Sequence, residues 1–246
     1  MSIANRALVR PLPVDSQAGG QRLFDVLIGT LMMVVALPVV SIAWAIVRLT
    51  SAGPGFYTQT RAGRFGRPFR IVKLRTMYQP REAAGRPWPP KPRPQVTPVG
   101  RVLRWLYIDR LPQVWNVLRG EMSVVGPRPE RPEIAGPLSR MLPGYGHRLR
   151  VRPGLTGLSQ VQLPAATDLG SVRRQLVLDR WYVARRSVWL DARLVALAGL
   201  TVCGLPGAVA CKVGRLPDPL VASADAVVDI VLDGVSAAPS VTARGG

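Results

Sequence analysis

The sequence predicts a mostly helical α+β fold with one small antiparallel element and one membrane helix near the N-terminus. Three observations favour it. Residues 26–47 contain no charged side chain, and residues 56–59 and 69–74 alternate like the arms of a short hairpin. Helical patterns follow, several of them basic, at residues 97–106, 131–144 and 171–189. With 246 residues and no internal repeat, the chain has room for one medium domain or two small ones.

The uncharged run at residues 26–47 is long enough to cross a bilayer, since 22 helical residues reach about 33 Å. Pro38 lies in its middle, where a proline removes one backbone hydrogen bond and kinks a helix. Arg22 precedes the run and Arg48 follows it, so the positive-inside bias places both ends on the cytoplasmic side. We therefore expect a re-entrant hairpin over residues 21–50, broken at Pro38. A true span and a buried soluble helix are the alternatives.

Composition changes divide the rest of the chain. Residues 78–95 are rich in proline, arginine and glycine and predict a surface loop. The expected segments are a disordered lead at 1–20, the membrane hairpin at 21–50, a cytoplasmic-face domain at 51–195, an apolar interfacial segment at 196–214 and a flexible tail at 215–246.

The charge of the chain requires an anionic partner. The formal net charge is +19, carried almost wholly by arginine, which suits nucleic acid, an acidic membrane face or phosphorylated ligands. A mean hydropathy of +0.16 favours membrane contact. Nucleic-acid binding is disfavoured, because only 6% of residues are aromatic and they form no stacking platform.

The rarity of histidine and cysteine excludes several kinds of chemistry. His147 is the sole histidine, which rules out a Ser-His-Asp or Cys-His mechanism and any two-histidine metal site. Cys203 and Cys211 lie in an apolar segment and indicate neither a disulfide framework nor a zinc site. Any chemistry must therefore use carboxylates and arginines.

Asp109 is a carboxylate surrounded in sequence by cations. Between residues 50 and 120 there are 14 Lys or Arg but only two acids, Glu82 and Asp109. Neighbouring positive charge lowers the pKa of a carboxyl group, so we expect Asp109 to stay ionised. The same cations would hold a phosphorylated ligand against it, as a carboxylate nucleophile attacking phosphorus requires. The alternative is a helix N-cap before Pro112, and the two interpretations are compatible.

Further basic residues are candidates for phosphate binding. A strand over residues 70–75 would present Lys73 and Arg75 on one face with Arg61 nearby, unless these charges only protect an exposed edge strand. Arg152 opens a glycine-punctuated loop that suits a phosphate. Arg104, in the basic helix before Asp109, completes the set.

Three ordered blocks of residues resemble a known family. The first holds Gln59-Thr60-Arg61-Ala62-Gly63 with Gly66, Phe69, Lys73 and Arg75-Thr76-Met77. The second holds Asp109, Leu111-Pro112-Gln113, Asn116-Val117-Leu118-Arg119-Gly120, Met122-Ser123 and Val125-Gly126-Pro127-Arg128-Pro129. The third runs from Arg152 to Val161, followed by Asp179, Tyr182, Trp189 and Asp191. Over residues 21–194 the chain resembles the bacterial sugar transferases, monotopic polyprenyl-phosphate sugar-1-phosphate transferases that start exopolysaccharide, O-antigen and glycan assembly.

The resemblance implies a location and a reaction. It places the chain at the cytoplasmic face of the bacterial inner membrane, in contact with anionic lipids, and makes residues 51–195 the transferase domain. A nucleotide-sugar, usually a UDP-sugar with Mg²⁺, would give its sugar 1-phosphate to polyprenyl phosphate. Asp109 would be the nucleophile that forms a phosphosugar intermediate, and Arg128 would contact phosphate. Whether the chain forms a homodimer stays open.

Arg110 departs from the family, in which a glutamate follows the aspartate and helps to hold Mg²⁺. An arginine there attracts a diphosphate but repels a divalent cation. Three outcomes are open. Another acid holds the metal, the guanidinium partly replaces the metal, or the chain is a catalytically silent relative that binds ligand or scaffolds an assembly system. The acids considered for the metal are Glu121, Asp168 and Asp179.

Overall fold

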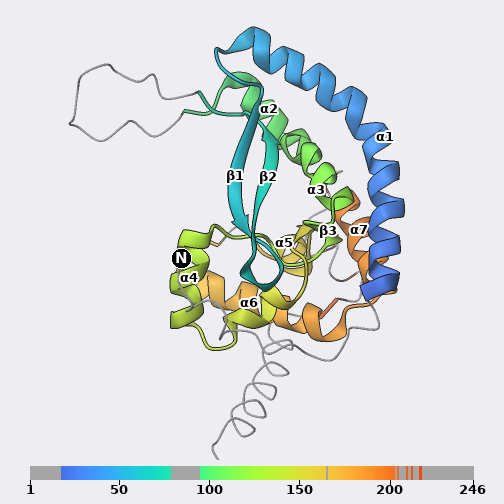
Figure 1. The fold of residues 1–246 in the computed structure, drawn as a ribbon, viewed down its shortest axis with the longest axis vertical. Helices are drawn as coiled ribbons and strands as arrows, with labels where there is room; N and C mark the ends of the chain where they lie inside the picture. Colours follow the sequence, from blue (N-terminus) through green and yellow to red (C-terminus); the bar gives the residue numbers. More distant parts are fainter. Residues whose placement is uncertain are drawn as a thin grey trace, which may run out of the picture.

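The computed structural model describes residues 18–78, 95–164 and 166–202, together with residues 204, 209, 212, 216 and 217. Most of the expected lead at 1–20, the loop at 78–95 and the tail at 215–246 lies outside the described residues. The fold is a mixture of helices and small sheets (Figure 1), which confirms the predicted class. In chain order the elements are α1 (Ala18–Thr50), β1 (Phe56–Ala62), η2 (Arg64–Gly66), β2 (Pro68–Leu74), α2 (Pro98–Trp105), η3 (Ile108–Gln113), α3 (Val114–Leu118), β3 (Ser123–Val125), α4 (Pro132–Met141), η4 (Tyr145–Arg150), β4 (Gly154–Thr156), α5 (Leu158–Gln162), α6 (Leu169–Arg185) and α7 (Val188–Val202), where η marks a 3-10 helix.

The N-terminal apolar segment is one helix, α1, of 33 residues with Pro38 inside it. It curves along one side of the domain (Figure 1) and does not reverse its direction. Pro38 therefore lies within a continuous helix and does not separate two helices. The physical reason is that a proline removes a single backbone hydrogen bond, and a helix whose flanking turns remain bonded continues through it with a bend.

One face of α1 packs on the domain and the opposite face is apolar and exposed. Ala36, Ala43 and Val47 are buried, whereas Leu31 and Val34 are about two thirds exposed. Residues 19–50 form a helix long and apolar enough to cross a membrane. A helix with an apolar outer face along its whole length suits burial in lipid, and re-entrant against spanning topology stays a prediction.

The expected hairpin is confirmed as the antiparallel pair β1–β2, which runs in register from Phe56 opposite Leu74 to Ala62 opposite Pro68. Its turn uses left-handed backbone at Phe65 and Gly66, with φ of 57° and 73°. Because side chains alternate along a strand, Arg61, Ile71 and Lys73 fall on one face of the hairpin.

A second sheet, absent from the sequence prediction, joins β3 to β4 in parallel, with Ser123 opposite Gly154 and Val125 opposite Thr156. The two chains approach closely beyond the strands. A Cβ atom added to Gly154 would collide with the backbone nitrogen of Gly126. Glycine is therefore required here for the loop that follows β3 to reach its position.

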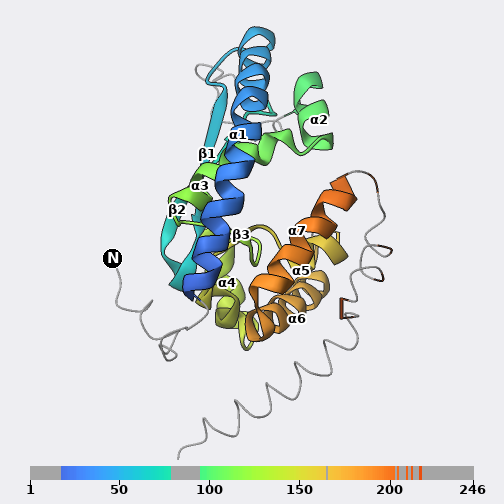
Figure 2. The ribbon, with the colours of Figure 1, turned by 90° about the vertical axis from the view of Figure 1, so that its right-hand side faces the viewer.

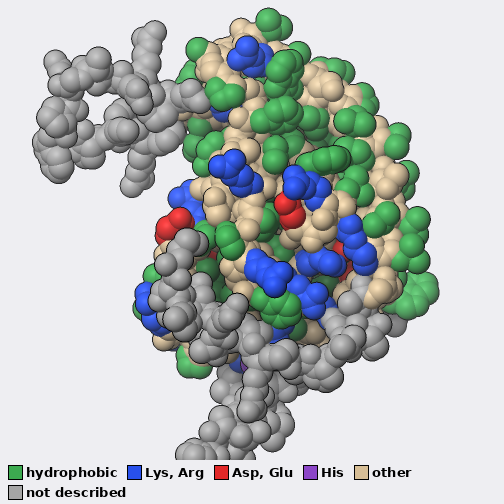
Figure 3. All heavy atoms as spheres, in the orientation of Figure 1, with side chains coloured by type: hydrophobic (Ala, Val, Ile, Leu, Met, Phe, Trp, Pro, Cys, Tyr) green, Lys and Arg blue, Asp and Glu red, His purple; other side chains and the backbone are tan. Residues whose placement is uncertain are grey.

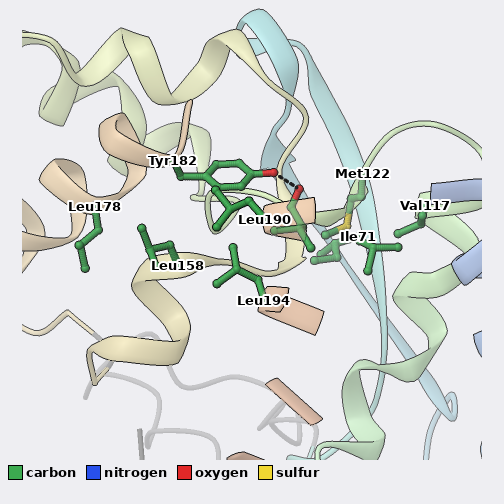
Figure 4. Packing of buried hydrophobic residues seen from close by; sticks show 10 residues of the cluster. Ile71, Val117, Met122, Leu158, Leu178, Tyr182, Leu190 and Leu194 are labelled. Atoms are coloured by element: carbon green, nitrogen blue, oxygen red, sulfur yellow. Dashed lines mark hydrogen bonds between the residues drawn. The ribbon is translucent and has the colours of Figure 1, made fainter. Parts of the chain in front are cut away.

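The main core lies between the hairpin and helices α5, α6 and α7 (Figures 2 and 4). The Tyr182 hydroxyl donates to the Val125 carbonyl at 3.2 Å and to the Asp191 carboxylate at 2.7 Å, which ties α6 to β3 and α7. Figure 4 shows this ring among the apolar side chains of the core, namely Ile71, Val117, Met122, Leu158, Leu178, Leu190 and Leu194.

Helix α7 crosses the boundary expected between residues 195 and 196. Leu194 belongs to the main core and Leu197 is buried in a neighbouring cluster with Val161. Leu197 therefore packs within the domain, whereas Leu200 and Val202 are about half exposed, and the interfacial position of residues 196–214 stays a prediction.

Candidate active site

The site is a hollow walled by cationic side chains from four different parts of the chain. Figure 3 shows Lys and Arg side chains gathered around acidic ones over the middle of one face, with hydrophobic side chains along α1 at its edge. The hollow is lined by Arg61, Ile71, Lys73, Arg110, Gln113, Arg128, Pro129, Gly154, Leu155 and Gln160.

Backbone contacts hold the loop of Arg128 in place from two sides. Arg61 on β1 donates to the Pro129 carbonyl at 3.0 Å. The Arg148 guanidinium donates to the Arg128 carbonyl at 2.9 Å and forms a buried ion pair, also 2.9 Å, with Asp179 on α6. The prolines on either side of Arg128 further restrict the backbone. Arg128 therefore enters the hollow from a rigid support.

Asp109 and Arg110 lie in η3, directly after a left-handed residue, Tyr107, with φ of 57°. The Arg110 guanidinium lies 5.2 Å from the centroid of the Tyr107 ring, a cation–π contact that orients it. The N-cap interpretation of Asp109 is wrong, because α3 begins at Val114 after Gln113 and has no side-chain cap.

Burial raises the pKa of the Asp109 carboxyl group above its usual range, and Arg110, Lys73 and Arg104 oppose that rise. The neighbouring cations do lower the pKa of Asp109, as expected, but the net shift is upward. The cause is desolvation, which penalises the charged form and outweighs the attraction of the cations. A carboxylate of raised pKa is more basic, which strengthens it as a nucleophile once ionised.

Lys73 shows how crowded with positive charge the hollow is. Burial, together with the charges of Arg61, Arg128 and Arg110, lowers the pKa of its ammonium group to about 8, and the opposing effect of Asp109 is smaller. Like charges held this close repel one another unless an anion lies between them. The arrangement therefore suits a ligand that carries several negative charges.

Three of the predicted phosphate-binding residues lie outside the lining of this hollow. Arg75 is buried and donates to the backbone carbonyls of Ala52 and Ser51 at 2.6 and 2.7 Å, which closes the loop after α1. Arg104 donates to the Thr76 hydroxyl at 2.9 Å but still acts electrostatically on Asp109. Arg152 lines a different hollow.

The acids considered for Mg²⁺ do not line the hollow either. Glu121 accepts from the Asn116 amide at 2.6 Å, Asp168 caps the N-terminus of α6, and Asp179 is paired with Arg148. Within the described ranges no three His, Cys, Asp or Glu side chains meet as metal ligands would. The side chains that line the hollow include no carboxylate, so they do not fit a magnesium ion, which prefers carboxylate and carbonyl oxygens.

Two glutamines of the site were not singled out from the sequence. Gln113 and Gln160 line the hollow, and the Gln113 Nε2 and Gln160 Oε1 atoms are buried without a hydrogen-bond partner in the described structure. The Arg61 Nε atom is also buried without a hydrogen-bond partner in the described structure. A buried polar atom without a partner is costly, so these atoms mark places where a polar ligand would bind. Their position inside the resembling motifs was the only available signal.

Comparison with known proteins shows that the chain is similar to one protein family. The family model described as bacterial sugar transferase matches residues 16–204. The chain is 39% identical to the UDP-glucose:undecaprenyl-phosphate glucose-1-phosphate transferase of Caulobacter vibrioides, over 75% of this chain and 70% of that protein. It is 37% identical to the UDP-N-acetylgalactosamine-undecaprenyl-phosphate N-acetylgalactosaminephosphotransferase of Aeromonas hydrophila, over 75% of this chain. A UDP-glucose:undecaprenyl-phosphate glucose-1-phosphate transferase of Escherichia coli is 35% identical over 78% of the chain. The match spans only 44% and 43% of the last two proteins.

Proposed function

The chain belongs to the bacterial sugar transferase family, and we propose that it transfers a sugar 1-phosphate from a UDP-sugar to polyprenyl phosphate. This reaction starts the assembly of an extracellular polysaccharide or glycan. The observation that supports the proposal is that one carboxylate, Asp109, interacts electrostatically with Arg110 and Lys73, two of the four cationic side chains that line the hollow. The names of the relatives supply the substrate classes.

The first step is attack by Asp109 on the donor. A carboxylate oxygen of Asp109 bonds to the phosphorus that bears the sugar, and the bond from that phosphorus to the bridging oxygen breaks. The nucleoside monophosphate leaves with the electron pair, and the sugar phosphate stays on Asp109 as an acyl phosphate. The cations of the hollow neutralise the diphosphate, without which two anions would repel one another.

The second step is attack by the lipid. A phosphate oxygen of polyprenyl phosphate bonds to the same phosphorus, the bond to Asp109 breaks, and the carboxylate is regenerated. The product is a polyprenyl diphosphate sugar, and no net proton is consumed. Splitting the displacement in this way lets each anion meet the phosphorus while the same cations screen its charge.

The position of Asp109 beside α1 supports a lipid acceptor. The preceding residue, Ile108, packs in a cluster with Ala43 and Val47 of α1. Nearby Trp105 is 77% exposed and Trp115 is 53% exposed, and aromatic side chains favour the boundary between lipid and water. We place the reaction at the cytoplasmic face of the inner membrane, where anionic lipids attract basic residues by about 1 kcal/mol each.

The test is an assay of detergent-solubilised protein with labelled UDP-sugars and polyprenyl phosphate. We expect lipid-linked sugar phosphate from the native chain and none above background from Asp109→Asn. Intact-protein mass spectrometry without the lipid should show the native chain heavier by one sugar phosphate. The matched control is Arg173→Gln on the exposed face of α6, which should behave as native. Transfer that survives Asp109→Asn would refute the role of this residue.

A catalytically silent binder is the second candidate, because Arg110 follows Asp109 and no carboxylate is among the residues that line the hollow. Native protein that binds UDP yet yields neither covalent adduct nor product with any donor in the panel would establish it in place of the enzyme.

A further inference from the structure

The hollow beside Asp109 holds an excess of positive charge supplied by the chain itself. Four cationic side chains, Arg61, Lys73, Arg110 and Arg128, line it. With the carboxylates of Asp109, which acts on Lys73, and of Glu130, which acts on Arg61 and Arg128, they amount to a net formal charge of +2. A diphosphate with two ionised phosphate groups is therefore neutralised by side chains alone.

The unpartnered polar atoms of the hollow also favour an anion. Arg61 Nε and Gln113 Nε2 are buried donors without partners among the described residues, and donors bind phosphate oxygens. A metal ion needs oxygen ligands, and of the unpartnered atoms lining the hollow only Gln160 Oε1 is an acceptor. The site thus offers a phosphate its donors and offers a divalent cation few ligands.

Arg110 is the residue that makes the site favour a phosphate over a divalent cation. Its guanidinium is fixed over the Tyr107 ring at 5.2 Å and lines the hollow next to Asp109. A fixed guanidinium presents two parallel N–H groups to a phosphate, which a metal ion would otherwise bridge. The remaining acids considered for a metal have other partners, so none stands ready beside Arg110.

We propose that Arg110 replaces a divalent cation in this chain, so that the site binds the diphosphate of its nucleotide-sugar directly and works without Mg²⁺. The inference rests on the proposed function for the identity of the ligand. It also predicts how the requirement for metal can be restored. Arg110→Glu lowers the formal charge of the site by two, which is the charge that one divalent cation supplies.

Binding of UDP is the first measurement, by calorimetry on detergent-solubilised protein in EDTA and in excess Mg²⁺. The native chain should bind equally in both buffers, within about threefold. Arg110→Gln removes one charge-assisted hydrogen-bonding group and should weaken binding about tenfold to a hundredfold in EDTA. Arg110→Lys keeps the positive charge but loses the two parallel N–H groups of the guanidinium, so its affinity for UDP should lie between those of the native chain and Arg110→Gln. Arg173→Gln on α6 removes an exposed arginine and should bind as native.

The charge-reversed variant supplies the opposite result. Arg110→Glu should bind UDP weakly in EDTA and recover at least tenfold in Mg²⁺, with a thermal melt like that of the native chain to show that it is folded. Native binding that falls more than tenfold in EDTA would overturn the proposal. So would Arg110→Gln binding as tightly as the native chain, or a native chain that binds no UDP in either buffer.

The transfer assay separates this proposal from the proposed function. If EDTA abolishes product formation, the proposed transferase activity is supported and the proposal of a metal-free site is refuted. In the opposite case, UDP binds equally well with and without EDTA, binding depends on Arg110, and no donor yields product. That result would support the metal-free site and refute the proposed transferase activity.

Discussion

The ionisation of Lys73 gives a prediction that can be worked in detail. The folded protein holds the pKa of Lys73 at about 8, well below its usual 10.5, because the side chain is buried beside Arg61, Arg128 and Arg110. Its ammonium is therefore charged below pH 8 and neutral above it. If charged Lys73 binds the diphosphate, affinity is highest below pH 8 and falls as the pH rises past it.

The size of the fall follows from the pKa. At pH 7 about nine tenths of the free protein carries the Lys73 charge, and at pH 9 about one tenth does. The free energy needed to protonate Lys73 before binding grows by about 1.4 kcal/mol for each pH unit above 8. Native affinity for UDP should therefore fall about fivefold to tenfold between pH 7 and pH 9.

Calorimetric titrations at pH 7, 8 and 9 test this, with Lys73→Arg as the matched control. The arginine stays charged throughout the range, so its profile should be flat, and any slope that the two proteins share belongs to the ligand or to other groups. Lys73→Met should bind weakly at pH 7 and also show no fall. A native profile as flat as that of Lys73→Arg would refute the argument.

Three further predictions concern the framework of the site. Arg148→Met leaves Asp179 as an unpaired buried acid and should cost about 3–5 kcal/mol in chemical denaturation, most of it recovered in the double variant with Asp179→Leu; a cost under about 1 kcal/mol would contradict the buried pair. Gly154→Ala should lower stability by about 1–3 kcal/mol because its Cβ meets the Gly126 backbone, and an unchanged melting temperature by circular dichroism would count against that contact. Arg22→Gln loses hydrogen bonds of 2.7 and 2.6 Å to the backbone carbonyls at the end of α3. It should lower the free energy of unfolding by about 1–3 kcal/mol and speed amide exchange at residues 114–118. Exchange as slow as in the native chain would contradict a stabilising role for these bonds.

Local signals in the sequence predicted much of the fold. The apolar run of α1, the alternation of the β1–β2 hairpin and the helical pattern of α2 each depend on neighbours within a few residues, and each element is present. The pairing of β3 with β4 was not predictable, because it joins two three-residue strands about thirty residues apart. Such short strands have too few residues for a period to be visible.

The charged residues of the candidate site could be predicted from the sequence, but their burial and hydrogen bonds could not. Sequence alone identified Asp109 and cations of the hollow such as Lys73 and Arg128, because these residues stand in recognisable blocks. It misjudged the pKa of Asp109 and the role of Arg75, because both depend on burial. Desolvation and the hydrogen bonds of Arg75 come from the packing of distant segments, which no local pattern records.

The apolar helix α1 and Asp109 belong to one rigid framework. Asp25 of α1 accepts hydrogen bonds from Ser123 Oγ and Val124 N at 2.7 and 2.8 Å, which fixes one part of α1 to β3. Further along, Ala43 and Val47 of α1 pack in a cluster with Ile108, the neighbour of Asp109. If α1 lies in the membrane as proposed, its depth in the lipid sets the height of Asp109. The phosphate of a polyprenyl lipid lies at the boundary between lipid and water, so in the proposed reaction this coupling would bring Asp109 and the acceptor to one level without a large conformational change.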